Sequence, residues 1–151
     1  MPDPLTTQSD PYFIDFEQRV RDTQALMAEQ GLNVYLGSRL RTLSWIMDAF
    51  LPWRSFVVIP PEGLPTAITF VIDAARVADD SWLDEDHVLG YGPMGGQDQI
   101  SVLRDLIEPH LMNGCGAIGI ETGTATYLPE GNLTQYEHEC LTAALPGAQL
   151  I

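Results

Sequence analysis

The sequence predicts an α/β fold of three layers, in which helices cover both faces of a mixed, mostly parallel β-sheet with a central hairpin. In the second half of the chain, strand-like segments alternate with helical ones, as in parallel sheets with crossover helices. In the middle, two strand-like segments are separated by only a few turn residues, which favours an antiparallel pair. The chain has 151 residues and is 45% hydrophobic, which suits one compact domain with a real core.

The first element is a helix predicted over residues 15–30. Its apolar positions recur at helical spacing on one face, at Phe16, Val20 and Met27. Asp15 can cap the first turn, with Gln18 three residues later as a capping box requires. Gly31 can take the left-handed conformation that commonly ends a helix.

A strand follows over 33–37, and residues 38–50 suggest a short helix or an irregular turn. The segments 55–59 and 66–72 are rich in β-branched and aromatic residues, which favours strands. Between them lies the turn sequence Pro60-Pro61-Glu62-Gly63, so these two strands form the expected hairpin.

The second half alternates helices and strands. Asp73 is a candidate N-cap for a helix through residue 78, and 87–91 is a short strand. Asp98 is a candidate N-cap for a helix with apolar positions at Ile100, Leu103, Ile107 and Leu111, which Pro109 ends or bends.

Residues 117–120 have the composition of a buried strand. Asn132 and Gln135 form a candidate capping box for a further helix, and Pro146 and Gly147 end it. Residues 148–151 begin a last strand.

The charge of the chain disfavours some classes of binding partner. The formal net charge is −14, and all seven basic residues are arginines. Such a surface repels nucleic acids and anionic lipids, so neither partner is expected. The acidic residues are scattered, which favours an acidic, salt-adapted surface, although an acidic interface for a basic partner is the alternative.

Targeting signals are also not expected. No apolar run approaches the ~18–20 residues that cross a bilayer. Residues 1–14 are expected to be a flexible terminus without a secretion signal, which predicts a cytoplasmic protein.

No catalytic or metal-binding motif is predicted. The three histidines, His87, His110 and His138, lie far apart, and the segment Glu137-His138-Glu139 is typical of a solvated helix face. Cys115 and Cys140 are expected to be small buried side chains. The loop 92–96 precedes a helix, but it lacks the residues of a phosphate-binding loop and is expected to be a turn. A small enzyme using this loop or Cys115 is the remaining catalytic alternative.

One aromatic segment, residues 45–54, could contact a partner. It contains Trp45, Phe50, Trp53 and Arg54 between two predicted elements. Large aromatic side chains usually pack on something, so they either fill the core beneath the loop or form a contact surface for another domain, subunit or substrate. In the second interpretation, the planar guanidinium of Arg54 could bind a carboxylate.

Several motifs together resemble one family. They are Glu17-Gln18-Arg19 in the first helix, the turn Gly31-Leu32-Asn33, the hairpin segments 54–60 and 65–72, Ile118-Gly119-Ile120-Glu121, and Leu145-Pro146-Gly147-Ala148. In this order and spacing, they resemble the N-terminal domain of the creatinase, prolidase and Xaa-Pro aminopeptidase family over residues 15–151. A loose match is the segment Trp45-Ile46-Met47-Asp48, where the family has a tighter motif.

The resemblance implies a creatinase N-terminal domain with a ribonuclease H-like topology. It also implies a parent enzyme that is a metal-dependent Xaa-Pro peptidase or related C–N hydrolase, with a pair of Mn, Co or Zn ions in a C-terminal catalytic domain absent from this chain. This domain would then be inactive alone, form a homodimer, and cover the active site. A free-standing module of the same fold that binds a small ligand or a protein is the alternative.

Overall fold

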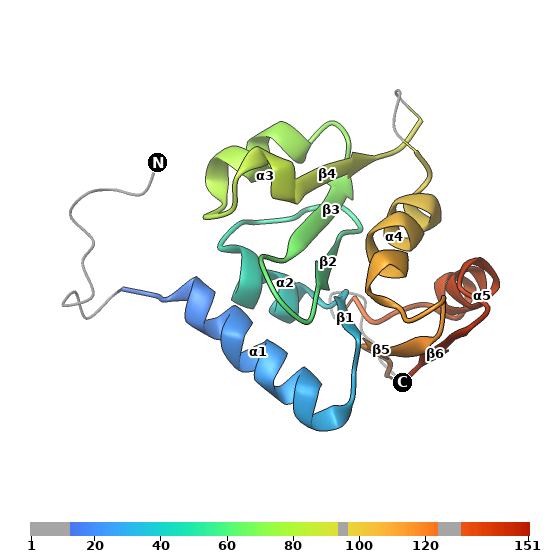
Figure 1. Cartoon of the computed structure of the whole chain (residues 1–151). Helices are drawn as coiled ribbons and strands as arrows, with labels where there is room; N and C mark the ends of the chain where they lie inside the picture. Colours follow the sequence, from blue (N-terminus) through green and yellow to red (C-terminus); the bar gives the residue numbers. More distant parts are fainter. Residues whose placement is uncertain (1–12, 94–96, 124–130) are drawn as a thin grey trace.

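The computed structural model describes residues 13–93, 97–123 and 131–151, which form a six-stranded sheet in the order β4-β3-β2-β1-β5-β6 (Figure 1). The strands are β1 (Val34–Gly37), β2 (Phe56–Ile59), β3 (Thr66–Phe70), β4 (Val88–Tyr91), β5 (Gly116–Ile120) and β6 (Ala148–Leu150). Only β2 runs antiparallel to its neighbours. The mixed, mostly parallel sheet with its β2–β3 hairpin is therefore confirmed.

Three helices cover one face of the sheet: α1 (Phe16–Gln30), α2 (Leu40–Met47) and α3 (Ala74–Asp80) (Figure 1). Their apolar side chains pack with those of the sheet in one core cluster. The opposite face is covered by α4 (Gln99–Ile107) and α5 (Gln135–Ala144), which contribute to a second cluster. The three predicted layers are thus present.

The hairpin strand β2 contributes side chains to the core clusters on both faces of the sheet. Val57 and Ile59 lie in the α1–α3 cluster, whereas Phe56 and Val58 lie in the α4–α5 cluster. Side chains alternate between the two faces of a strand, so a continuous apolar segment fits a strand that is buried on both sides. All four residues are buried, as such a central strand requires.

Several predicted helix ends are confirmed. The carboxylate of Asp15 accepts a hydrogen bond from the backbone N–H of Gln18, and Gly31 ends α1 with φ of 69°. Asp98 caps α4 by accepting from the N–H of Ser101. A short 3-10 helix, Glu108–His110, contains Pro109 and follows α4 directly.

The other two predicted caps had different outcomes. Asp73 is the N-cap residue of α3, as expected, but its carboxylate makes no capping hydrogen bond and accepts from Nε of Arg76 at 3.4 Å. The capping box of α5 is formed by Thr134 and Glu137, two residues later than expected. The sequence offers two candidate pairs with the same spacing, and tertiary contacts decide between them.

A second short 3-10 helix lies directly before β4. Residues Glu85–His87 form a 3-10 helix, so the predicted strand begins one residue later, at Val88. Of the predicted flexible terminus, residues 1–12 lie outside the described residues, and Phe13 and Ile14 are exposed. No helix among the described residues is long and apolar enough to cross a membrane.

Candidate functional site

The candidate site lies at the edge of the sheet where the parallel strands end. Strands β1 and β5 are parallel neighbours, and they end at Gly37 and Ile120. Strand β2 runs in the opposite direction, so it begins at this same edge with Phe56. Ligands of open α/β sheets commonly bind in the crevice at this edge. Here, the segment before β2 brings Arg54 to this edge.

Arg54 forms a bidentate ion pair with Glu137 of α5. Its Nε lies 2.8 Å from Oε1 and its Nη2 lies 2.7 Å from Oε2 of the same carboxylate. Two parallel hydrogen bonds of this kind are both stronger and more directional than a single charged contact. The pair therefore fixes the start of β2 against the first turn of α5.

The remaining donors of Arg54 are also used. Nη1 donates to the carbonyl of Gly131 at 2.7 Å, and Nη2 donates to the carbonyl of Asn132 at 3.2 Å. The guanidinium also lies over the ring of Phe56, 4.5 Å from its centroid. Binding an external carboxylate in the same way would require the side chain to release these partners, so a substrate-binding role for Arg54 stays a prediction.

Glu137 was predicted to lie on a solvated helix face, and this was wrong. It is only 8% exposed, because the helix turns it toward Arg54 at the edge of the sheet. Its carboxylate also accepts from the backbone N–H and the hydroxyl of Thr134, at 2.8 and 2.9 Å. The capping-box spacing was the one signal in the sequence that could have identified it.

The ionisation of Glu137 reflects these contacts. Burial alone would raise the pKa of its carboxyl group, but the hydrogen bonds from Arg54 and Thr134 outweigh burial and lower it. Glu137 is therefore a carboxylate at neutral pH. Beside it, the hydroxyl of Tyr91 donates to the carbonyl of Arg54 at 2.6 Å, and burial raises the pKa of this phenol.

A second carboxylate, Glu121, lies at the end of β5 and holds the start of α2. It accepts hydrogen bonds from the backbone N–H groups of Ser38 and Arg39, at 2.6 and 2.7 Å, and from the hydroxyl of Thr42. Negative charge is favourable at a helix N-terminus, where backbone N–H groups lack partners within the helix. Glu121 is the last residue of the Ile118-Gly119-Ile120-Glu121 motif. Its carboxylate thus caps the N-terminus of α2 from a segment that is distant in the sequence.

The aromatic segment 45–54 divides between the core and the surface. Ile46, Met47 and Leu51 are buried, whereas Trp45, Phe50 and Trp53 are exposed by 53%, 66% and 51% of their surface. The three large rings therefore do not fill the core beneath the loop.

The two tryptophans have different neighbours. Trp53 packs against Phe70 with 5.6 Å between ring centroids, while Trp45 lies beneath the guanidinium of Arg19, 3.7 Å from its ring centroid. Trp45 lies within α2 and faces Arg19 of α1, so the expectation that it belongs to an irregular segment was wrong. Phe50 and Trp53 lie on the irregular segment between α2 and β2.

The cysteines differ from expectation. Cys115 is exposed and Cys140 is half-buried, so the prediction of a buried side chain was wrong for Cys115. Cys115 belongs to a tight turn before β5, where its N–H and carbonyl pair with Met112.

Of the glycine loop 92–96, residues 94–96 lie outside the described residues.

The described residues do not suit a metal ion. Within residues 13–93, 97–123 and 131–151, no three His, Cys, Asp or Glu side chains are grouped so that they could hold one. Glu121 and Glu137 are instead saturated by donors of the protein. At this edge, Glu121 and Glu137 have a structural role, because their contacts hold β1, β2, β5, α2 and α5 together.

Comparison with solved structures identifies the class of fold. The chain has the fold of the N-terminal creatinase/prolidase-like domain of Xaa-Pro dipeptidases and aminopeptidases. No protein-family model and no curated protein matches the sequence.

Three solved structures illustrate the likeness. The N-terminal creatinase/prolidase-like domain of a metallopeptidase from Corynebacterium diphtheriae is 19% identical, with a TM-score of 0.62 over 90% of this chain and 94% of that one. An Xaa-Pro aminopeptidase structure from Streptococcus pyogenes is 17% identical, with a TM-score of 0.64 over 90% and 89%. The Xaa-Pro dipeptidase of Bacillus anthracis is 12% identical, with a TM-score of 0.67 over 91% of this chain. This chain spans 33% of that dipeptidase.

Proposed function

We propose that this chain is the non-catalytic N-terminal domain of a cytoplasmic Xaa-Pro peptidase or creatinase-type metallohydrolase, acting in dimerisation and in covering the active site. The observation that carries the proposal is the fold, which matches N-terminal domains of such peptidases over about nine-tenths of the chain. In the Bacillus anthracis dipeptidase, the matching part is a third of the chain. The catalytic residues and the Mn, Co or Zn pair would belong to the remainder of the parent enzyme.

The side chains that would contact the parent enzyme or a second copy are Phe50 and Trp53, exposed on the segment before β2, and Ile72, exposed on the segment after β3. Exposed aromatic side chains in one region commonly mark protein interfaces. Their base is rigid, because Arg54 beside them is fixed by Glu137 and by two backbone carbonyls. A rigid aromatic surface loses little conformational entropy on docking.

Two measurements on the purified chain test this proposal. In a peptidase assay with Xaa-Pro dipeptides and added Mn²⁺ or Co²⁺, we expect no hydrolysis. In sedimentation analysis over a range of concentrations, we expect reversible dimers, weakened by Trp53→Ala without loss of the folded circular-dichroism spectrum. The matched control is Met112→Ala, which removes another exposed side chain, 77% accessible, before β5.

Three results would contradict the non-catalytic role or the proposed interface. Metal-dependent hydrolysis by the isolated chain would show that the chemistry lies within it. A chain that is monomeric at every concentration would contradict the homodimer. Equal weakening by Trp53→Ala and Met112→Ala would exclude Trp53 as a specific interface residue.

A further inference from the structure

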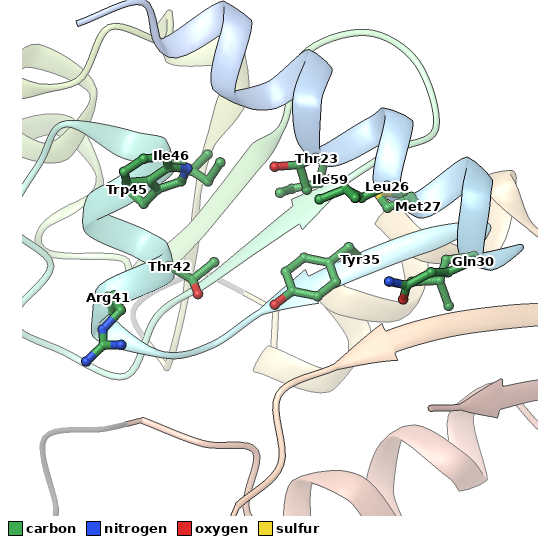
Figure 2. Close-up of a pocket in the computed structure, with 11 residues that line it drawn as sticks. Thr23, Leu26, Met27, Gln30, Tyr35, Arg41, Thr42, Trp45, Ile46 and Ile59 are labelled. Carbon is green, nitrogen blue, oxygen red and sulfur yellow. The ribbon is translucent and has the colours of Figure 1, made fainter.

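A groove of ≈ 370 Å³ lies between α1 and α2, above the face of the sheet (Figure 2). Its walls come from the C-terminal half of α1, from α2, and from strands β1 and β2. The apolar lining includes Leu26, Met27, Leu32, Trp45, Ile46 and Ile59. Pockets for small molecules in proteins begin at about 300 Å³ and are mostly apolar, with a few polar groups that orient the ligand.

The charged group of this groove is Arg41, which lies at the α2 end, whereas Gln30 lies at the α1 end (Figure 2). Arg19, Arg21, Arg54, Arg76 and Arg104 all donate hydrogen bonds to protein groups, and Arg39 also has an interaction. Among the residues that the structure describes, Arg41 is the arginine with no hydrogen bond or ion pair. In a chain of net charge −14, an arginine without a side-chain partner thus lines the apolar groove at its α2 end.

Two polar side chains of the groove, Tyr35 and Thr42, already interact with the carboxylate of Glu121. Burial raises the pKa of the Tyr35 phenol, and the neighbouring carboxylate of Glu121 raises it further, so Tyr35 stays neutral. Glu121 itself is bound by the N–H groups of Ser38 and Arg39. Its charge is therefore compensated locally, and Arg41 remains the charged residue of the lining that is available to a ligand.

We infer that this groove binds a small carboxylate with an apolar or aromatic body, which lies between Leu26 and Trp45 while its carboxylate pairs with Arg41. The planar guanidinium matches the two oxygens of a carboxylate. A single cation in a strongly acidic chain suits one negative charge better than a phosphate dianion. This site is separate from the Phe50–Trp53 surface of the proposed function.

The test is an NMR titration of the ¹⁵N-labelled chain with indole-3-propionate and with its neutral amide. We expect saturable shifts confined to α1, α2 and the indole N–H of Trp45. The acid should bind about tenfold more tightly than the amide, since a charged hydrogen-bonded pair is replaced by a neutral one. Arg41→Gln should remove this preference, and Arg41→Lys should restore part of it.

Two matched variants locate the site. Arg21→Gln removes an arginine on α1 that pairs with Glu17, and it should leave both affinities unchanged. Leu26→Asp places a carboxylate on the wall at a position that is 56% exposed, and it should abolish binding of the acid while the protein stays folded. Equal affinity for acid and amide, shifts outside the groove, or no saturable shift would each overturn the inference. The peptidase and sedimentation assays use other residues, so their outcomes are independent.

Discussion

The guanidinium of Arg54 and the carboxylate of Glu137 form a bidentate pair, with Nε–Oε1 and Nη2–Oε2 distances of 2.8 and 2.7 Å, across 83 positions of sequence. The pair joins the entry of β2 to the N-terminus of α5. It also gathers the carbonyls of Gly131 and Asn132 around the same guanidinium. One arginine thus joins the start of β2 to the stretch that leads into α5 and to the first turn of α5.

Glu137→Gln should lower the free energy of unfolding by about 3 kcal/mol at neutral pH, because it leaves a largely buried arginine without its counter-charge. Chemical denaturation monitored by circular dichroism would measure this loss. The matched control is Glu139→Gln, since Glu139 lies on the same helix and is exposed. We expect that control to change stability by less than about 0.5 kcal/mol. Similar losses in the two variants would contradict a special role for Glu137.

The same pair predicts a pH dependence. The pKa of Glu137 is lowered in the folded state, so the unfolded chain binds the proton more tightly. Its stabilising contribution is therefore fully present above the ordinary glutamate pKa of about 4.3 and is lost as the pH falls through the lower folded pKa. The stability difference between the wild type and Glu137→Gln should shrink on acidification through this window. A difference that is constant from neutral to acidic pH would contradict this linkage.

Glu121→Gln tests the cap of α2. The substitution removes the charge and one of the two carboxylate oxygens that serve Ser38, Arg39 and Thr42, so we expect a loss of about 1–2 kcal/mol, as for other helix caps. Amide hydrogen exchange should become faster in α2 and not in α4, which has its own cap in Asp98. Glu62→Gln, in the exposed turn between β2 and β3, is the matched control and should be neutral. Unchanged exchange in α2 would exclude the capping role.

Gly131→Ala tests the close approach beside the ion pair. Gly131 has φ of 70°, and an added Cβ would lie 2.7 Å from the carbonyl oxygen of Ser38. Gly31 has nearly the same φ, 69°, but an added Cβ there meets nothing within 4 Å. Both alanine variants carry the cost of a left-handed conformation, of order 1 kcal/mol. We therefore expect Gly131→Ala to be the more destabilising in thermal unfolding, and equal losses would contradict a steric contribution.

Local sequence determined most of the fold. The apolar spacing of α1, the caps at Asp15 and Asp98, and the β2–β3 turn are short-range features, so each could be predicted without knowledge of distant segments. The alternation of helices and strands then favoured the mostly parallel sheet that the structure has. Of the aromatic residues that the sequence singled out, Phe50 and Trp53 lie between regular elements, whereas Trp45 belongs to α2.

Tertiary structure decided which polar groups meet. Glu137 lies in a locally hydrophilic sequence, and only the packing of α5 beside β2 turns it toward Arg54. Likewise, Glu121 caps α2 from 79–83 residues away, a partnership that no local spacing encodes. The sequence alone determined the elements and their order, because propensity, caps and periodicity act within a few residues. The ion pair, the distant cap and the groove beside Arg41 depend on where those elements pack, because long-range contacts form only once the sheet and its two helical layers are assembled.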